Sequence, residues 1–164
     1  MPPTAFSLNG DVAIVTGAGS RLPGEIGNGR AAAIVLARQV SNGSRVRSSL
    51  CSTGYQGAKV ALLDINIQHA LQTKKMIDAE GGISQVIECD VTDEESCKAA
   101  VARTVELFGA VHILVNIVGV GGTHGTVVNL DLKAWDRDFK INVCSTYAIL
   151  FGLFNHPYRS QAWF

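Results

Sequence analysis

A short apolar run that ends in a glycine-rich turn constrains this chain more than any other feature. Residues 12–15 are apolar and largely β-branched, which is typical of a buried parallel strand. Thr16 and Gly17 end this run, and residues 30–38 are rich in good helix formers. The turn between them contains further glycines, at Gly19, Gly24, Gly27 and Gly29. The sequence therefore predicts a strand, a glycine turn and a helix in direct succession.

This arrangement predicts a phosphate-binding turn. Glycines let the backbone approach a pyrophosphate closely, and the free N–H groups and the dipole at the start of a helix favour negative charge. A strand before the turn and a helix after it are both expected, so the pattern indicates a dinucleotide site. The alternative is an ordinary strand-to-helix turn in which glycine is needed only for tight packing.

The rest of the chain continues the alternation. Strands are predicted at 59–63, 84–88 and 111–115, and helices at 68–79, from a Thr92 cap to 108, and at 131–149. Thr92 and Glu95 have the spacing of a capping box. Strands that alternate with helices favour right-handed crossovers and a doubly wound parallel α/β sheet. We expect a single domain over residues 1–164, with about four strands.

Polar residues follow several of the predicted strands. Asp64, Asp90 and Asn116 each lie just after a strand, as Thr16 and Gly17 do. Ligands of such sheets bind beyond the carboxyl ends of the strands. Asp64 there can accept hydrogen bonds from an adenosine ribose and would repel a 2′-phosphate, which favours NAD over NADP. Its alternative is a solvated loop acid.

Asp90, after the predicted strand at 84–88, also has two possible interpretations. Asp90 can accept from an adenine amino group, with the Val91 N–H beside it. Alternatively, Asp90 is a turn acid that caps the local backbone.

Composition excludes several other classes of function. Lys and Arg number 14 and Asp and Glu number 14, so nothing indicates a nucleic-acid or anionic membrane partner. No apolar run approaches the roughly 20 residues of a bilayer span, and the first residues lack the pattern of a signal peptide. Scattered histidines and cysteines without ligand spacing predict no metal site, and the free thiols favour a cytoplasmic protein.

These motifs resemble those of the short-chain dehydrogenase/reductase family. Thr16-Gly17 with Gly27 and Gly29 is similar to the family's T-G-x-x-x-G-x-G loop, and residues 116–119 (Asn-Ile-Val-Gly) to its N-N-A-G motif with two changes. Asp64 matches the NAD-selecting acid, and Asp90-Val91 the adenine-contacting pair. Ile141-Asn142-Val143 resembles the segment whose Asn belongs to the catalytic tetrad.

The resemblance implies a Rossmann-type fold and an NAD-dependent oxidoreductase, with NADP the less favoured cofactor, acting on a small alcohol or ketone. It implies a catalytic role for Asn142, whose main-chain carbonyl holds a proton-relaying water in the family, and a homo-oligomer for the full-length family. The cofactor-binding residues that it implies are Gly17, Gly19, Ser20, Ile26, Gly27, Asp64, Asp90, Val91 and Asn116.

Several stretches depart from the family pattern. Residues 21–25 lengthen the glycine loop and are expected to fold aside, residues 40–56 form an atypical insertion, and residues 144–164 form an atypical tail. The family's catalytic Ser and Tyr-x-x-x-Lys do not follow Val143, so we expect a catalytically incomplete chain. The open alternatives are a non-catalytic dinucleotide-binding module and a mis-spliced fragment without function.

The same departures predict exposed apolar surface. The fourth strand is expected at an open sheet edge, because the family's fifth strand would lie beside it. Four apolar side chains of the final helical region are then expected to be partly uncovered, namely Trp135, Phe139, Ile149 and Phe151.

Overall fold

A four-stranded parallel sheet forms the centre of the molecule. The computed structural model describes residue 8 and residues 10–21, 25–38 and 57–157. Its strands are β1 (Val12–Thr16), β2 (Lys59–Asp64), β3 (Ser84–Glu88) and β4 (Ile113–Asn116), in the order β3-β2-β1-β4. The predicted doubly wound parallel α/β sheet is confirmed.

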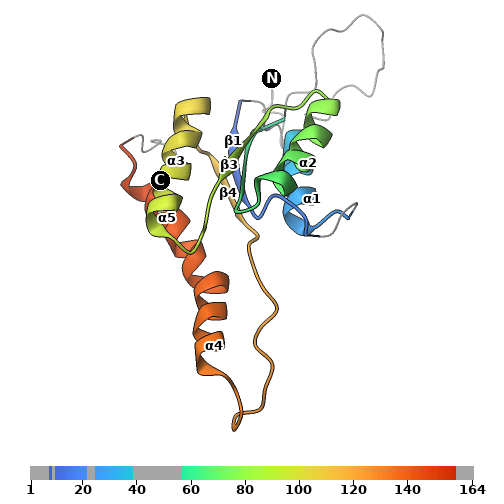
Figure 1. The fold of residues 1–164 in the computed structure, drawn as a ribbon. Helices are drawn as coiled ribbons and strands as arrows, with labels where there is room; N and C mark the ends of the chain where they lie inside the picture. The colour runs from blue at the N-terminus through green and yellow to red at the C-terminus, as the bar shows by residue number, and fades with distance from the viewer. Residues whose placement is uncertain (1–7, 9, 22–24, 39–56, 158–164) are drawn as a thin grey trace, which may run out of the picture.

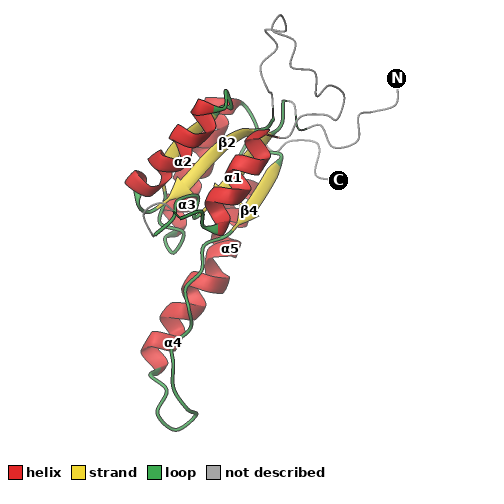
Figure 2. Ribbon diagram, turned by 90° about the vertical axis from the view of Figure 1, so that its right-hand side faces the viewer, coloured by secondary structure: helices red, strands yellow, loops and turns green. Residues whose placement is uncertain are grey.

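Helices cover both faces of this sheet (Figures 1 and 2). α1 (Asn28–Arg38) and α2 (Ile67–Ala79) pack on one face, and α3 (Glu94–Phe108) and α5 (Ser145–Asn155) pack on the other. Ala13 and Val15 of β1 join the core under α1 and α2, whereas Ile14 joins the core under α3 and α5. Burial on both faces explains why β1 is a continuous apolar run rather than an alternating one.

β4 begins at Ile113, two residues later than predicted. The main-chain N–H of His112 donates to the Val12 carbonyl, with N and O 2.8 Å apart. The Val12 N–H donates in turn to the His112 ring nitrogen Nδ1, at 2.9 Å. A side chain therefore takes the place of a main-chain acceptor at this end, and the regular ladder starts only after His112.

The predicted start of α3 is wrong by one residue. Asp93, not Thr92, caps this helix, and its carboxylate accepts from the Ser96 N–H at 2.9 Å. The Thr92 hydroxyl donates instead to the Asp90 carboxylate at 2.7 Å. Glu95 completes no capping box and pairs with Lys98 at 2.8 Å. Asp93 provides a charged acceptor at the cap, and Thr92 already has a partner.

The predicted final helix is interrupted. α4 (Leu132–Phe139), capped by Asp131, leads into a π-helical turn (Lys140–Cys144), which leads into α5. The Asn142 side chain bonds the Val120 backbone in both directions, with Val120 N to Oδ1 at 2.8 Å and Nδ2 to the Val120 carbonyl at 3.2 Å. π-turns are rare and often mark functional sites. This one ties the helical region to the loop after β4.

α4 and the loop before it project from the body as an arm (Figures 1 and 2). Trp135 and Phe139 on this arm are 51% and 52% exposed, as predicted. β4 lies at the sheet edge, also as predicted, with its four side chains half-buried.

The expectation for Ile149 is wrong: this side chain is fully buried, because α5 docks on α3. Phe151 is half-buried, with the Lys98 ammonium 5.4 Å from its ring centroid.

The predicted insertion at 40–56 lies outside the described residues, but the residues beside it do not. The Ala58 N–H donates to the Leu36 carbonyl of α1 at 3.1 Å. A Cβ on Gly57 would lie 2.3 Å from the Ala37 carbonyl oxygen. The end of α1 and the start of β2 are thus in direct contact, as in a chain with a short connection. The predicted atypical tail is helical through Asn155, and residues 158–164 lie outside the described part.

Replacement of Ile149 tests whether α5 is docked in solution. We expect Ile149→Ala to lower the free energy of unfolding by about 2–5 kcal/mol, because it leaves a cavity between α5 and α3. The matched control is Tyr147→Ala on the same helix, since Tyr147 is 67% exposed and should change little. Urea denaturation followed by circular dichroism measures both, and equal effects would contradict the docked arrangement.

Candidate functional site

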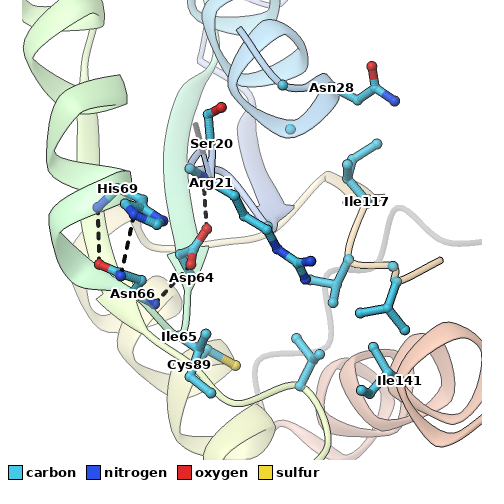
Figure 3. A pocket seen from close by; sticks show the side chains of 18 of the residues that line it. Ser20, Arg21, Asn28, Asp64, Ile65, Asn66, His69, Cys89, Ile117 and Ile141 are labelled. Atoms are coloured by element: carbon cyan, nitrogen blue, oxygen red, sulfur yellow. Dashed lines mark hydrogen bonds between the residues drawn. The ribbon is translucent and has the colours of Figure 1, made fainter. Parts of the chain in front are cut away.

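A cavity of about 580 Å³ lies at the carboxyl ends of the strands (Figure 3). Its walls come from the glycine loop after β1, the turns after β2 and β3, the loop after β4 and the π-turn. The lining residues are Gly17, Gly19, Ser20, Arg21, Gly27, Asn28, Gly29, Asp64, Ile65, Asn66, His69, Cys89, Asp90, Val91, Thr92, Ile117, Val118, Gly119, Val120 and Ile141. The ends of all four strands therefore contribute to one pocket.

The glycine loop brings β1 and α1 into backbone contact. A Cβ added to Gly29 would lie 1.9 Å from the Gly17 carbonyl oxygen, so only glycine fits there. Gly17 has a φ of +62°, in the left-handed region that glycine adopts without strain. These two residues set the first turn of α1 directly against the end of β1. The N-terminus of α1 consequently faces the pocket through Gly27, Asn28 and Gly29.

Two backbone amides orient Asp64. The Gly19 N–H donates to Oδ2 at 2.8 Å, and the Asn66 N–H donates to Oδ1 at 2.9 Å. His69 packs behind Gly19, where an added Cβ would come within 2.4 Å of the His69 Cβ. The carboxylate is therefore fixed at the rim of the pocket, beside the glycine loop.

A buried arginine fastens the glycine loop to α2. Arg30 is 1% exposed, and its guanidinium donates to the Glu25 carbonyl at 2.7 Å and to the Thr73 hydroxyl at 3.1 Å. It also donates to the Gln72 side chain at 3.0 Å, and Thr73 donates onward to the Ala18 carbonyl at 2.7 Å. Neutral oxygens thus surround this cation. Arg30 was not among the predicted site residues, although it directly follows Gly29, the last glycine of the motif.

Asp90 organises the turn after β3. Its Oδ1 accepts from the Thr92 N–H at 2.8 Å and from the Thr92 hydroxyl at 2.7 Å. These hydrogen bonds hold the pKa of the Asp90 carboxyl below its usual value of 3.8. The Asp90 N–H donates to the Ser96 hydroxyl at 3.0 Å. Asp90 therefore acts as a turn acid, which was the alternative prediction, and it also lines the pocket.

The structure brings most of the predicted cofactor-binding residues together. Three of the predicted site residues do not line the pocket. Ile26 is 62% exposed, and the Asn116 amide oxygen accepts weakly from the Thr16 hydroxyl at 3.5 Å. Asn142 bonds Val120, while its neighbour Ile141 lines the pocket. The predicted residues that do line it are Gly17, Gly19, Ser20, Gly27, Asp64, Asp90 and Val91.

Some lining residues were not predicted. Arg21 was expected to fold aside, but it lines the pocket and its side chain extends across it (Figure 3). Asn66, His69 and Cys89 lie within a few residues of a strand end, so a wider window around each strand end would have included them. Within the described ranges, no three side chains of the metal-ligating types converge. None of the described helices combines the length and the hydropathy of a bilayer crossing.

Known proteins resemble this chain in sequence and in structure. A family model described as enoyl-(acyl carrier protein) reductase matches residues 52–153. A short-chain dehydrogenase/reductase from Burkholderia xenovorans has a similar structure, with a TM-score of 0.75 and 33% identity, over 92% of this chain and 50% of that one. The chain belongs to the short-chain dehydrogenase/reductase family. The resemblance seen in the motifs is confirmed.

Two curated family members show the extent of the likeness. Cyclohexanol dehydrogenase from Acinetobacter sp. (strain SE19) is 30% identical over 140 residues, which cover 85% of this chain and 47% of that protein. Human 15-hydroxyprostaglandin dehydrogenase (NAD(+)) is 31% identical over 140 residues, covering 84% and 41% respectively. The chain thus spans about half the length of the family members it matches.

The Gly29 contact can be tested by adding one methyl group. Alanine in place of glycine inside a helix is ordinarily favourable by about 0.5–1 kcal/mol. At Gly29 the collision with the Gly17 carbonyl outweighs this gain, so we expect Gly29→Ala to destabilise the fold by about 2 kcal/mol or more. Gly27→Ala is the matched control, because its Cβ would meet nothing closer than 3.6 Å. Thermal unfolding compares the two, and equal stabilities would contradict the backbone contact.

The Asp90 turn predicts a specific pH dependence. Because the folded-state pKa of Asp90 lies below 3.8, its stabilising contribution is complete above that unfolded-state value and is lost as the pH falls through the folded-state value. We expect Asp90→Asn to flatten the acid limb of the stability curve below about pH 4. Denaturant unfolding between pH 2 and 7 measures this, and parallel curves for the two proteins would contradict it.

Proposed function

We propose that this pocket binds NAD(H), as the dinucleotide site of an oxidoreductase that acts on an alcohol or ketone. The observation that carries the proposal is Asp64, a carboxylate held by two backbone amides beside the glycine loop. The names of two relatives support this assignment, since one is a 15-hydroxyprostaglandin dehydrogenase (NAD(+)) and the other a cyclohexanol dehydrogenase.

The diphosphate belongs at the start of α1. Gly27, Asn28 and Gly29 line the pocket there, where the helix N-terminus presents free N–H groups and the positive end of its dipole. The close contact between Gly29 and Gly17 keeps this end of the helix near the strand. The Arg30 bonds to Glu25 and Thr73 hold the loop in that position.

The adenosine ribose belongs at Asp64. Each carboxylate oxygen accepts one amide N–H, which fixes the orientation of the group and leaves a further lone pair on each oxygen for the ribose hydroxyls. A 2′-phosphate at this position would meet the same negative charge at close range. NAD is therefore the proposed cofactor, in preference to NADP.

Adenine belongs between the turns after β2 and β3. Asp90 bonds Thr92 through Oδ1, and within the described part of the chain Oδ2 has no hydrogen-bond donor, so it can accept from the exocyclic amine. Val91 lines the same wall and has its side chain buried. Both features fit a base that carries one amino donor and two apolar faces.

The nicotinamide, when bound, would exchange a hydride with the carbonyl carbon of the substrate. Asn142 is the proposed tetrad residue of this chain. Its side-chain amide is bound to the Val120 backbone, and the proposed water belongs at its main-chain carbonyl. Ile141 in the same turn lines the pocket, so the π-turn lies within reach of the proposed cofactor.

The test compares NADH and NADPH binding to Asp64→Asn. The parent should bind NADH more tightly than NADPH, because only the second brings a phosphate to Asp64. Removal of the negative charge should weaken NADH about tenfold and abolish the preference, since one charge-assisted hydrogen bond is lost. Titration calorimetry measures the dissociation constants.

Glu88→Gln is the matched control for this experiment. Glu88 of β3 lies opposite Asp64 of β2 in the strand register and carries the same charge, but it does not line the pocket. It should bind both dinucleotides as the parent does. Failure of the parent to bind NADH, or an unchanged preference in Asp64→Asn with intact stability, would refute the proposal.

A further inference from the structure

The buried side chain of α4 is a carboxylate. Asp138 is 5% exposed, whereas the large apolar side chains of this helix are each more than half exposed, namely Leu132, Trp135 and Phe139. Burial of a charge costs free energy unless hydrogen bonds or an opposite charge compensate it. The buried contact of α4 is therefore polar rather than apolar, and the partners of Asp138 show what it holds.

Each carboxylate oxygen of Asp138 has a different partner. Oδ2 accepts from the Thr123 hydroxyl, in the loop after β4. Oδ1 accepts from the neighbouring Arg137 guanidinium, with Nε at 3.2 Å and a terminal nitrogen at 2.9 Å. The Thr123 bond, followed by the Arg137 bonds, holds the pKa of the Asp138 carboxyl below its usual value. Asp138 is thus a charged acceptor that joins α4 to the loop through Thr123.

Thr123 differs from the loop residues around it. Residues 121–129 are all exposed except Thr123, which is half-buried. A Cβ added to Gly121 or Gly122 would meet no heavy atom within 4 Å beyond its chain neighbours. Packing therefore does not hold these two glycines, and the Thr123 hydroxyl is the group that fixes the far end of this stretch.

Two hydrogen-bonded contacts hold segment 120–123 against the helical region. Val120 is bonded to the Asn142 side chain in both directions, and Thr123 is bonded to Asp138. Asp138 and Asn142 are four residues apart, a spacing that brings two side chains to the same side of a helix. The segment is therefore fixed at both of its ends, with two glycines between them.

One end of this segment belongs to the pocket wall. Gly119 and Val120 line the cavity together with Ile117 and Val118. The proposed positions of adenine, ribose and diphosphate lie at the turns after β2 and β3 and at the start of α1. The wall beside β4 then remains for the nicotinamide half of the dinucleotide, a step that rests on the proposed function.

We propose that Asp138 is a positioning residue for the nicotinamide end of the pocket, which acts through the Thr123 hydroxyl to keep Val120 in the wall. Asp138 does not itself line the cavity. A wall that is fixed in advance binds its ligand at a lower entropic cost than one that becomes ordered on binding. Loss of the contact should therefore weaken ligands that reach this wall and spare ligands that lack the nicotinamide.

Thr123→Val tests the proposal with a small change, because a methyl group replaces the hydroxyl. NADH should bind about tenfold more weakly than to the parent. ADP-ribose, which has the adenosine and the diphosphate but no nicotinamide, should bind as it does to the parent. Titration calorimetry measures both dissociation constants. An unchanged NADH affinity, or an equal loss for the two ligands, would overturn the proposal.

A second threonine of the same loop provides the matched control. The Thr126 hydroxyl donates to the Asn129 side chain at 2.9 Å, within the loop, and Thr126→Val should bind NADH as the parent does. Thr123→Ser keeps the hydroxyl and should restore most of the affinity that Thr123→Val loses. A loss in Thr126→Val equal to that in Thr123→Val, or no rescue by serine, would contradict a specific role of the Thr123 hydroxyl.

A double variant connects the effect to Asp138. Asp138→Ala should weaken NADH binding about as much as Thr123→Val does, and the combination of the two should weaken it no further, because both remove the same contact. Additive losses would overturn the pairing. Where Asp138→Ala fails to fold, the comparison of Thr123→Val with Thr123→Ser still decides the proposal.

Amide hydrogen exchange separates this inference from the proposed function. If the parent binds no NADH, the proposed function fails, but the Val120 N–H still reports on the wall through its bond to Asn142 at 2.8 Å. Thr123→Val should make this amide exchange faster and leave the Gly19 amide, which bonds Asp64, as in the parent. Unchanged exchange at Val120, or an equal increase at both amides, would overturn the inference.

Discussion

The pocket depends on one close backbone contact, between the first turn of α1 and the carbonyl of Gly17. A side chain at Gly29 would occupy the space of that carbonyl, so the helix reaches the strand end only because glycine has no Cβ. This contact aims the helix N-terminus at the cavity. The other walls are then placed by the sheet, because parallel strands β2, β1 and β4 end at the same edge. The backbone contact and the sheet therefore place the walls of the pocket, and side chains then hold the loops in position.

Side chains fix the loops in a second layer behind the pocket. Arg30 bonds the loop to α2, Asn142 bonds the loop after β4 to the π-turn, and Thr92 bonds the Asp90 carboxylate. Arg30 and Asn142 thereby bond main-chain atoms of the loops after β1 and β4, and the Asp90 carboxylate accepts the Thr92 N–H. Preorganised loops bind a ligand at lower entropic cost than loops that become ordered on binding. A pocket with fixed loops is therefore sensitive to substitution of the residues that support those loops, such as Arg30 and Asn142.

The strands and most helices could be predicted from the sequence because their signals are local. Apolar runs predicted β1, β2 and β3, and strand-end polar residues predicted the location of the pocket. What failed depends on contacts distant in sequence. The predicted Thr92 cap was wrong because the Thr92 hydroxyl bonds the Asp90 carboxylate instead. The π-turn was not predicted, and its Asn142 side chain bonds Val120, a residue 22 positions earlier in the chain. The position of Arg21 depends on how the lengthened glycine loop folds, and a loop has no hydrophobic periodicity from which its fold could be predicted.

Ile149 shows most clearly why the exposed face could not be predicted. Its neighbours on α5 and α4 are apolar as well, and sequence alone gave no reason to separate Ile149 from Trp135 or Phe139. The π-turn inserts an extra residue into the helical repeat, and after it α5 turns Ile149 into the core under α3. α4 before the turn keeps its apolar side chains outside, on the projecting arm. The irregular turn therefore separates α4, whose apolar side chains are exposed, from α5, which contributes Ile149 to the core.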